Sequence, residues 1–247
     1  MSKKGKSPAV AKPYYFAESR DYGKVVAAEV AFFKGLVAAK NHISGISKNP
    51  SLQTAIKEVA PFLMDQGKTL NVIVRFSVTD PRSKAVHTLL LGTLLKPSLP
   101  GTHAQATHFL CLADDDSFLS KIHADFDFHP EADEKKPSPH VQMGGRVFES
   151  LFKQSSNKSR NVCWNEKIDK PRLPSLPICT ALLWHWAFLE YSGSEQISGF
   201  LEAWHWKALV KEAENTVLRP YFEDGLGIID SQPDKGLLNA IYVPVAK

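Results

Sequence analysis

The sequence predicts an α+β fold in which an antiparallel five-stranded meander sheet packs against N-terminal and C-terminal helices. Two observations predict it. Both ends of the chain carry apolar residues at helical spacing, whereas residues 69–148 fall into runs of β-branched and apolar residues separated by turn signals. The links between these central runs are too short for crossover helices, which parallel pairing would need.

Composition and charge describe an ordinary globular chain. It is 43% hydrophobic and 23% charged, enough to bury a sizeable core. The net charge of +4 equals the contribution of four lysines near the start, which are Lys3, Lys4, Lys6 and Lys12. We therefore expect a disordered basic tail over residues 1–13 and one α+β domain over residues 14–247. Such a tail attracts phosphates only weakly, so the charge does not predict a basic groove.

Cysteine usage and hydropathy indicate the compartment. The three cysteines are far apart and form no CxxC pair, which disfavours a disulfide framework or a cysteine zinc site. The first residues carry lysines and no apolar h-region, so we expect no export, and no stretch approaches the roughly 20 apolar residues that span a bilayer. We expect a cytoplasmic protein without a membrane partner.

Two helices are predicted before the sheet. The first runs from Asp21 to about Lys40 and is apolar on more than one stripe, so we expect it to be packed on two sides or to lie at a subunit contact. The second runs from Ser51 to about Asp65, with Pro61 as a kink or boundary.

Five strands are then predicted, over residues 69–79, 85–95, 103–112, 118–129 and 139–148. Asp80–Lys84 reads as a hairpin turn between the first two. A long polar loop covers residues 153–173.

Two helices close the chain, from Pro177 to Tyr191 and from Ser194 to about Arg219, where Pro220 ends the second. Each carries two tryptophans two residues apart, a spacing that splits them between helix faces. We expect one of each pair in the core, and we favour core packing of both over an exposed partner surface. The pairs are Trp184 with Trp186 and Trp204 with Trp206.

The run from His123 to His129 carries the clearest chemical signal. In a strand, Ala124, Phe126 and Phe128 point to the core, whereas the four ionisable residues share the other face. Those four are His123, Asp125, Asp127 and His129. Aspartate is depleted in strands, and adjacent carboxylates repel each other unless a cation or histidinium lies between them. The competing interpretation is the solvated face of an ordinary hairpin.

The next strand adds to this row if His129 pairs with His140. That register sets Asp127 against Gln142, Asp125 against Gly144 and His123 against Arg146. A divalent metal, Zn, Mn or Mg, would then have ligands in His123, Asp125, Asp127, His129 and His140. Without metal, the catalytic set is His123, Asp125, Asp127, His140 and Arg146, acting in general acid–base cleavage of RNA.

Other signals are weaker. His87 and His108 lie in apolar strands and are expected to be satisfied core or edge histidines rather than ligands. No GxxxxGK[ST], GxGxxG, HExxH or GxSxG motif occurs, which disfavours an NTPase or a dehydrogenase. We expect no nucleotide cofactor.

The segment from Ile122 to Gly145 resembles TumE-like toxins of prokaryotic toxin-antitoxin and phage-defence loci. The resemblance covers about a tenth of the chain and rests on the His/Asp strand, a proline-containing loop and Ser-Pro-His-Val-Gln followed by glycines. It implies a bacterial conflict context. This chain differs from those small toxins in having long helices at both ends.

Two hypotheses follow from the sequence. The first is a nucleic-acid-directed hydrolase or ribonuclease-like toxin that uses the His/Asp strand. The second is a non-catalytic binding or assembly protein of a defence operon, which pairs with itself or with a partner through the apolar first helix and the tryptophan-bearing helices.

Overall fold

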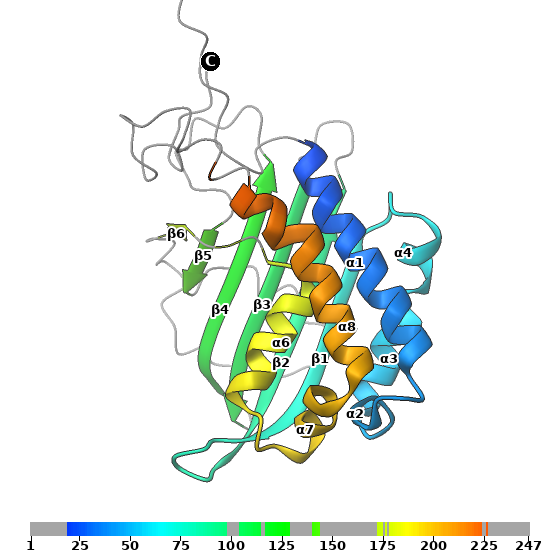
Figure 1. The fold of residues 1–247 in the computed structure, drawn as a ribbon. Coiled ribbons are helices and arrows are strands. Elements are labelled where there is room, and N and C mark those ends of the chain that lie inside the picture. The colour runs from blue at the N-terminus through cyan, green and yellow to red at the C-terminus, as the bar shows by residue number, and fades with distance from the viewer. Residues whose placement is uncertain are drawn as a thin grey trace, which may run out of the picture.

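The structure, a computed structural model, contains a six-stranded antiparallel sheet in the order β1 to β6 (Figure 1). It describes residues 19–97, 104–114, 117–128, 140–143, 172–174, 176, 178–223 and 226. The strands are β1 (Leu70–Thr79), β2 (Val86–Lys96), β3 (Ala104–Asp114), β4 (Ser117–Phe128), β5 (His140–Met143) and β6 (Arg172–Pro174). The predicted five-stranded meander is confirmed. β6 was not predicted, because three residues at the end of a polar stretch carry no readable period.

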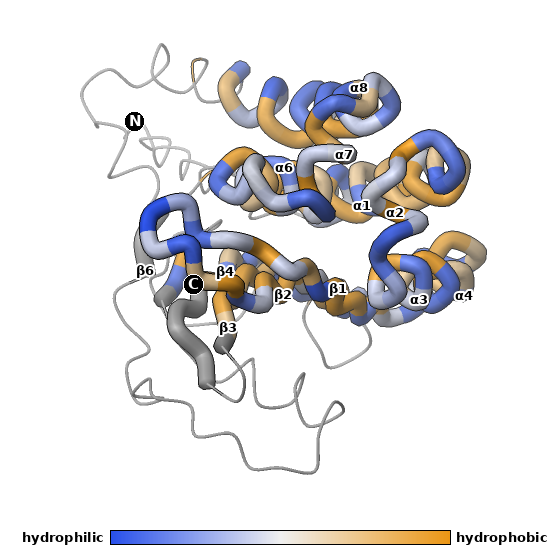
Figure 2. Tube along the Cα trace, turned by 90° about the horizontal axis from the view of Figure 1, so that it is seen from below, coloured by the Kyte–Doolittle hydropathy of each residue, from blue (hydrophilic) through white to orange (hydrophobic). Residues whose placement is uncertain are grey.

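One face of the sheet is apolar and lies against the helices. β1 shows this clearly, since its alternate residues are buried and those between them are mostly exposed. The buried residues of β1 are Leu70, Val72, Val74, Phe76 and Val78. Figure 2 shows α1, α6 and α7 on one side of the sheet, with α8 farther from it.

The described helices come from both ends of the chain. They are α1 (Ser19–Ala39), α2 (Ser44–Ser47), α3 (Pro50–Glu58), α4 (Ala60–Met64), α6 (Thr180–Glu190), α7 (Glu195–Glu202) and α8 (Trp204–Ala213), followed by a π-helical turn η1 (Glu214–Leu218). α1 packs on β3 and β4 below it and on α8 above it. Its predicted packing on two sides is therefore confirmed, and this placement explains why it is apolar on more than one stripe.

The helix boundaries differ from prediction at the C-terminal end. A break at Ala203, which is extended with φ −70° and ψ 123°, separates α7 from α8. The chain stays helical past Pro220, which was predicted to end the helix. The π turn η1 ends two residues before this proline, and its wider winding avoids the clash between a proline ring and the carbonyl one turn earlier. At the other end, Pro61 lies in the first turn of α4, which confirms it as a boundary.

The free edge of β1 is closed by side chains instead of another strand. Its outward backbone N–H groups at Arg75, Ser77 and Thr79 donate to the side chains of Ser51, Gln196 and Ser194, at 2.9, 3.0 and 2.9 Å. This capping pairs edge donors in the second half of β1, of the kind that make exposed strand edges prone to self-association.

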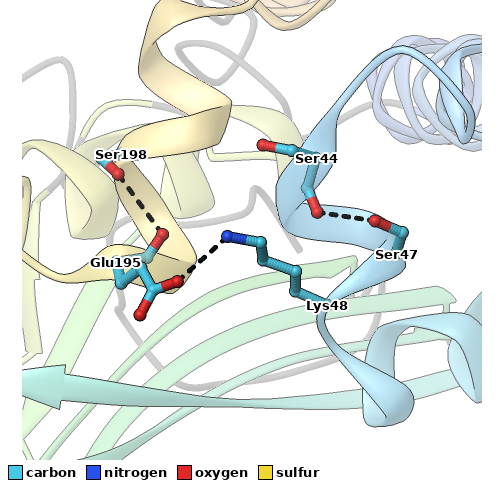
Figure 3. Close-up of polar contacts among 5 residues, drawn as sticks. All are labelled: Ser44, Ser47, Lys48, Glu195 and Ser198. Carbon is cyan, nitrogen blue, oxygen red and sulfur yellow. Dashed lines mark hydrogen bonds and ion pairs between the residues drawn. The ribbon is translucent and has the colours of Figure 1, made fainter.

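Close packing joins the N-terminal helices to the C-terminal ones. A Cβ at Gly45 of α2 would overlap the ring of Phe200 in α7, so glycine is required for this approach. At the rim of the same contact, Lys48 Nζ lies 3.0 Å from Glu195 Oε1 (Figure 3). Both side chains of this ion pair are exposed, so it adds little stability beside the apolar contact.

The aromatic core lies between the sheet and the helices. Phe32, Phe76, Phe188 and Phe200 surround Trp184 and Trp206, whose exposed fractions are both 0%. Trp186 and Trp204 are 36% and 69% exposed, so the favoured prediction that both members of each pair are core residues is wrong. The helix geometry explains this, because residues two apart point to different sides. Within the described residues, no helix is long and apolar enough to cross a membrane.

Candidate functional site

The polar face of β4 is the face that points away from the helices. His108 on β3 bonds to Glu29 of α1, and Ala124 lies directly opposite His108. Alternation therefore places His123 and Asp125 on the other side of the sheet, as predicted. Their exposed fractions are 1% and 6%, so the interpretation of a solvated hairpin face is wrong for these two residues.

Within this face, His123 and Asp125 are in contact. His123 Nε2 lies 3.1 Å from Asp125 Oδ2. Across the ladder, Thr107 Oγ1 donates a hydrogen bond to Asp125 Oδ1 at 2.6 Å. The carboxylate thus fixes one ring nitrogen of the imidazole and is itself held by a hydroxyl.

An aromatic side chain lies beside His123. Phe109 is its cross-strand partner on β3 and is fully buried. The ring of Phe109 lies over Gly92 of β2, where any Cβ would overlap it. The glycine therefore provides the space that the ring occupies, and the ring lowers the polarity around the imidazole.

The register between β4 and β5 differs from the assumed one by four residues. His140 pairs with Asp125 instead of His129, and Gln142 pairs with His123 instead of Asp127. A shift by an even number keeps the same side of the strand, so His140 and Gln142 still belong to the face of Asp125. The assumption failed because a long polar link, unlike a two-residue hairpin turn, does not fix the register.

The register also adds an arginine that the sequence did not suggest. Arg172 of β6 pairs with Gln142, which in turn pairs with His123. Arg172 therefore lies two strands from His123 in the same cross-strand row. Arg146, the arginine proposed from the sequence, lies outside the described residues.

The metal prediction depends on groups that the structure leaves undescribed. His129 lies outside the described residues, as do the side chains of Asp127 and His140, although their backbones belong to β4 and β5. In the described part of the chain, no three His, Cys, Asp or Glu side chains are placed to hold a metal ion. His123 and Asp125 are the two predicted ligands that the structure brings together.

A second histidine–carboxylate pair lies on the helix side of the sheet. Glu29 Oε1 lies 2.9 Å from His108 Nε2 and accepts a hydrogen bond from the backbone N–H of Thr180 at 2.7 Å. Glu29 therefore caps the first turn of α6 and ties α1 to β3, which is a structural role. His108 is a satisfied core histidine, as predicted. Glu29 was missed, although it is the only charged residue between positions 25 and 33 of an apolar run.

The Glu29 carboxylate affects two nearby groups. Burial, followed by the charge of Glu29, raises the pKa of Tyr22 to about 12. The same two causes, in the same order, raise the pKa of the fully buried Cys179 thiol above its usual range. Both groups are therefore neutral at physiological pH, and Cys179 is not a nucleophile.

Comparison with protein-family models, with curated proteins and with solved structures finds no match to this chain.

Proposed function

We propose that this protein is a nucleic-acid-directed hydrolase, a ribonuclease-like toxin, in which His123 is the general base and Asp125 orients it. The buried contact between His123 Nε2 and Asp125 Oδ2 at 3.1 Å is the observation that supports it. A carboxylate that holds one imidazole nitrogen leaves the other to exchange a proton with a substrate. The resemblance of residues 122–145 to TumE-like toxins favours a bacterial defence context.

The proposed reaction is transesterification of RNA. His123 Nδ1 takes the proton of a ribose 2′-hydroxyl, the 2′-oxygen bonds to phosphorus, and the bond from phosphorus to the 5′-oxygen breaks. Protonated His140, the cross-strand neighbour of Asp125, gives a proton to that 5′-oxygen. The products are a 2′,3′-cyclic phosphate and a free 5′-hydroxyl. Arg172, which belongs to the same cross-strand row, would balance charge on the phosphate.

A divalent metal would act at the same place through His123, Asp125 and further ligands from Asp127, His129 and His140. A bound metal would supply an activated water as the nucleophile, and the product would then lack the cyclic phosphate. The burial of His123 and Asp125 requires the sheet face to open before a substrate can reach them, so we expect slow turnover.

The test is cleavage of a labelled single-stranded RNA, with and without EDTA, followed by analysis of the product ends. We expect Asp125→Asn and His123→Gln to lower kcat by about 10²–10⁴-fold, the usual size of a general acid–base contribution. Thr107→Val should lower kcat by a smaller factor. Thr107→Ser, which keeps the hydroxyl, should retain the wild-type kcat.

Glu29→Gln is the matched control, because it alters a buried carboxylate that pairs with a histidine on the opposite side of the sheet. It should lower the melting temperature but not the activity of the folded protein. Cleavage at the wild-type rate in both Asp125→Asn and His123→Gln, or no cleavage by the wild-type chain with or without added Zn²⁺, Mn²⁺ or Mg²⁺, would refute the proposal.

The second candidate is a non-catalytic assembly protein. α1 cannot serve as its interface, because its apolar residues are already buried against the sheet and α8. Trp186 and Leu189 favour this candidate instead, since they are exposed and one turn apart on α6. Light scattering distinguishes the two functions, because an assembly role predicts an oligomer that Trp186→Ala and Leu189→Ala dissociate.

A further inference from the structure

We infer that the N-terminal end of α8 is a binding surface for single-stranded nucleic acid, with Trp204 as the platform on which a base stacks. This surface is separate from the proposed catalytic site. α8 is the helix layer farthest from the sheet (Figure 2), whereas His123 and Asp125 face away from the helices. The inference does not depend on the catalytic proposal.

The first observation is a supported stack of three rings. The Trp204 ring contacts the His205 ring in a tilted arrangement, with centroids 3.7 Å apart and an interplanar angle of 30°. His205 in turn stacks on His42 at 4.6 Å and 15°. His42 follows α1, so the stack bridges two helices that pack together. The indole at the end of this stack is held in place, yet 69% of Trp204 is exposed.

A large aromatic ring that is both supported and exposed is suited to stacking. Packing of Trp204 into the core does not explain it, because Trp206 fills that role two residues later with no exposure. Stacking on an aromatic side chain is favourable whatever the identity of the base, because every base has a π face.

The second observation is the charge beside this ring. Lys207 and Lys211 follow Trp204 at positions i+3 and i+7 of α8, so all three share one side of the helix, and all three are exposed. Neither lysine forms an ion pair with another described residue. They are therefore available to phosphates on the strand whose base stacks on Trp204.

The start of α8 adds to this local positive potential. Ala203 precedes the helix and provides no side-chain cap for its first turn. The N–H groups of that turn lie at the end where Trp204 is, and the helix dipole is positive there. Glu202 and Glu212 are exposed nearby and partly offset this potential, so we expect weak, salt-sensitive binding.

The test is fluorescence anisotropy with a fluorescein-labelled oligouridylate, in the wild-type chain and in Asp125→Asn. Loss of one stacked base predicts that Trp204→Ala weakens binding about fivefold to a hundredfold, while Trp204→Phe retains most of it. Phe222→Ala is the control, because it removes another exposed aromatic ring that is not part of the stack, and it should bind like the wild type. Lys207→Gln with Lys211→Gln should flatten the dependence of Kd on salt.

Three results would overturn the inference. The first is unchanged affinity in Trp204→Ala, and the second is an equal loss in Phe222→Ala. The third is a wild-type dimer that Trp204→Ala dissociates, since the surface would then bind a second copy of the chain. Binding that persists in Asp125→Asn while cleavage is lost would support both proposals, whereas binding without any cleavage would support this one alone.

Discussion

Phe109 and Gly92 determine the environment of His123. The Phe109 ring covers Gly92 so closely that any added Cβ would overlap it. We expect Gly92→Ala to displace the ring and to lower the free energy of unfolding by about 1–3 kcal/mol, as overpacked cores do. Urea denaturation measures this loss.

A double-mutant cycle identifies the cause of that loss. If the clash with the Phe109 ring is responsible, Gly92→Ala combined with Phe109→Leu should be less destabilised than the sum of the two single variants. Additive losses would show instead that the alanine acts through the strand backbone.

Tyr22 makes stability depend on alkaline pH. Its pKa is raised to about 12 in the folded chain, first by burial and then by Glu29, whereas an unfolded tyrosine titrates near 10. Between these values the unfolded chain has lost the proton that the folded chain keeps, so its contribution to stability is complete below pH 10 and falls as the pH rises to 12.

The measurement is urea denaturation at pH 9.5 and pH 11.5. We expect the wild-type chain to lose more stability over this interval than Tyr22→Phe, which has no phenol to ionise. An equal loss in both chains would assign the alkaline destabilisation to other groups.

Residue by residue, the sequence predicted the faces of the site but not its contacts. The alternation from His123 to Phe128 is local, so the shared side of His123 and Asp125 could be deduced. The hydrogen bond from Thr107 to Asp125 could not be deduced in this way, because it joins residues 18 positions apart. Arg172 was missed for the same reason, since its place in the row depends on pairing between β5 and β6.

The turn between β1 and β2 contains one residue in a strained backbone conformation. Lys84 has φ 62°, a left-handed conformation that costs most L-residues about 1–2 kcal/mol. At the start of the turn, Asp80 Oδ1 accepts hydrogen bonds from the backbone N–H groups of Arg82 and Ser83. These two hydrogen bonds are the main cause of the lowered pKa of Asp80.

Replacing Lys84 with asparagine should relieve this strain, since asparagine tolerates the left-handed region. We expect Lys84→Asn to raise the free energy of unfolding by up to about 1 kcal/mol in urea denaturation. Lys84→Ala keeps the steric cost and should leave the stability close to that of the wild type. A similar gain in both variants would mean that the lysine charge, and not the backbone, is responsible.

Helices and strands with strong local patterns were predictable, and those that depend on long-range contacts were not. β1 to β4 follow from period and turn residues alone. The break at Ala203 is different, because α8 must turn there to lie over α1, and nothing in the neighbouring residues marks that need. Pro220 was misread because its local rule applies to a regular α-helix, whereas a π turn precedes it.

The core of the molecule joins both ends of the chain into one body. α1 lies between the sheet and α8, and the buried cluster runs from Val25 to Val217 without a division between N-terminal and C-terminal parts. Glu29 adds a polar link between α1, β3 and α6 inside this core. Detaching any one of α1, α6 and α8 from the core would expose the apolar residues of the others.

This continuity predicts one cooperative unfolding transition. Two of the five tryptophans, Trp184 and Trp206, are buried between the sheet and the helices, so tryptophan fluorescence changes when this core opens. Far-UV circular dichroism reports on the backbone as a whole. The two signals should give the same urea midpoint, because neither part of the core persists without the other. Leu36→Ala, in the middle of α1, should shift both midpoints together by an amount equivalent to about 2–5 kcal/mol. Separate midpoints, or a shift in fluorescence alone, would show that the sheet and the helices unfold independently.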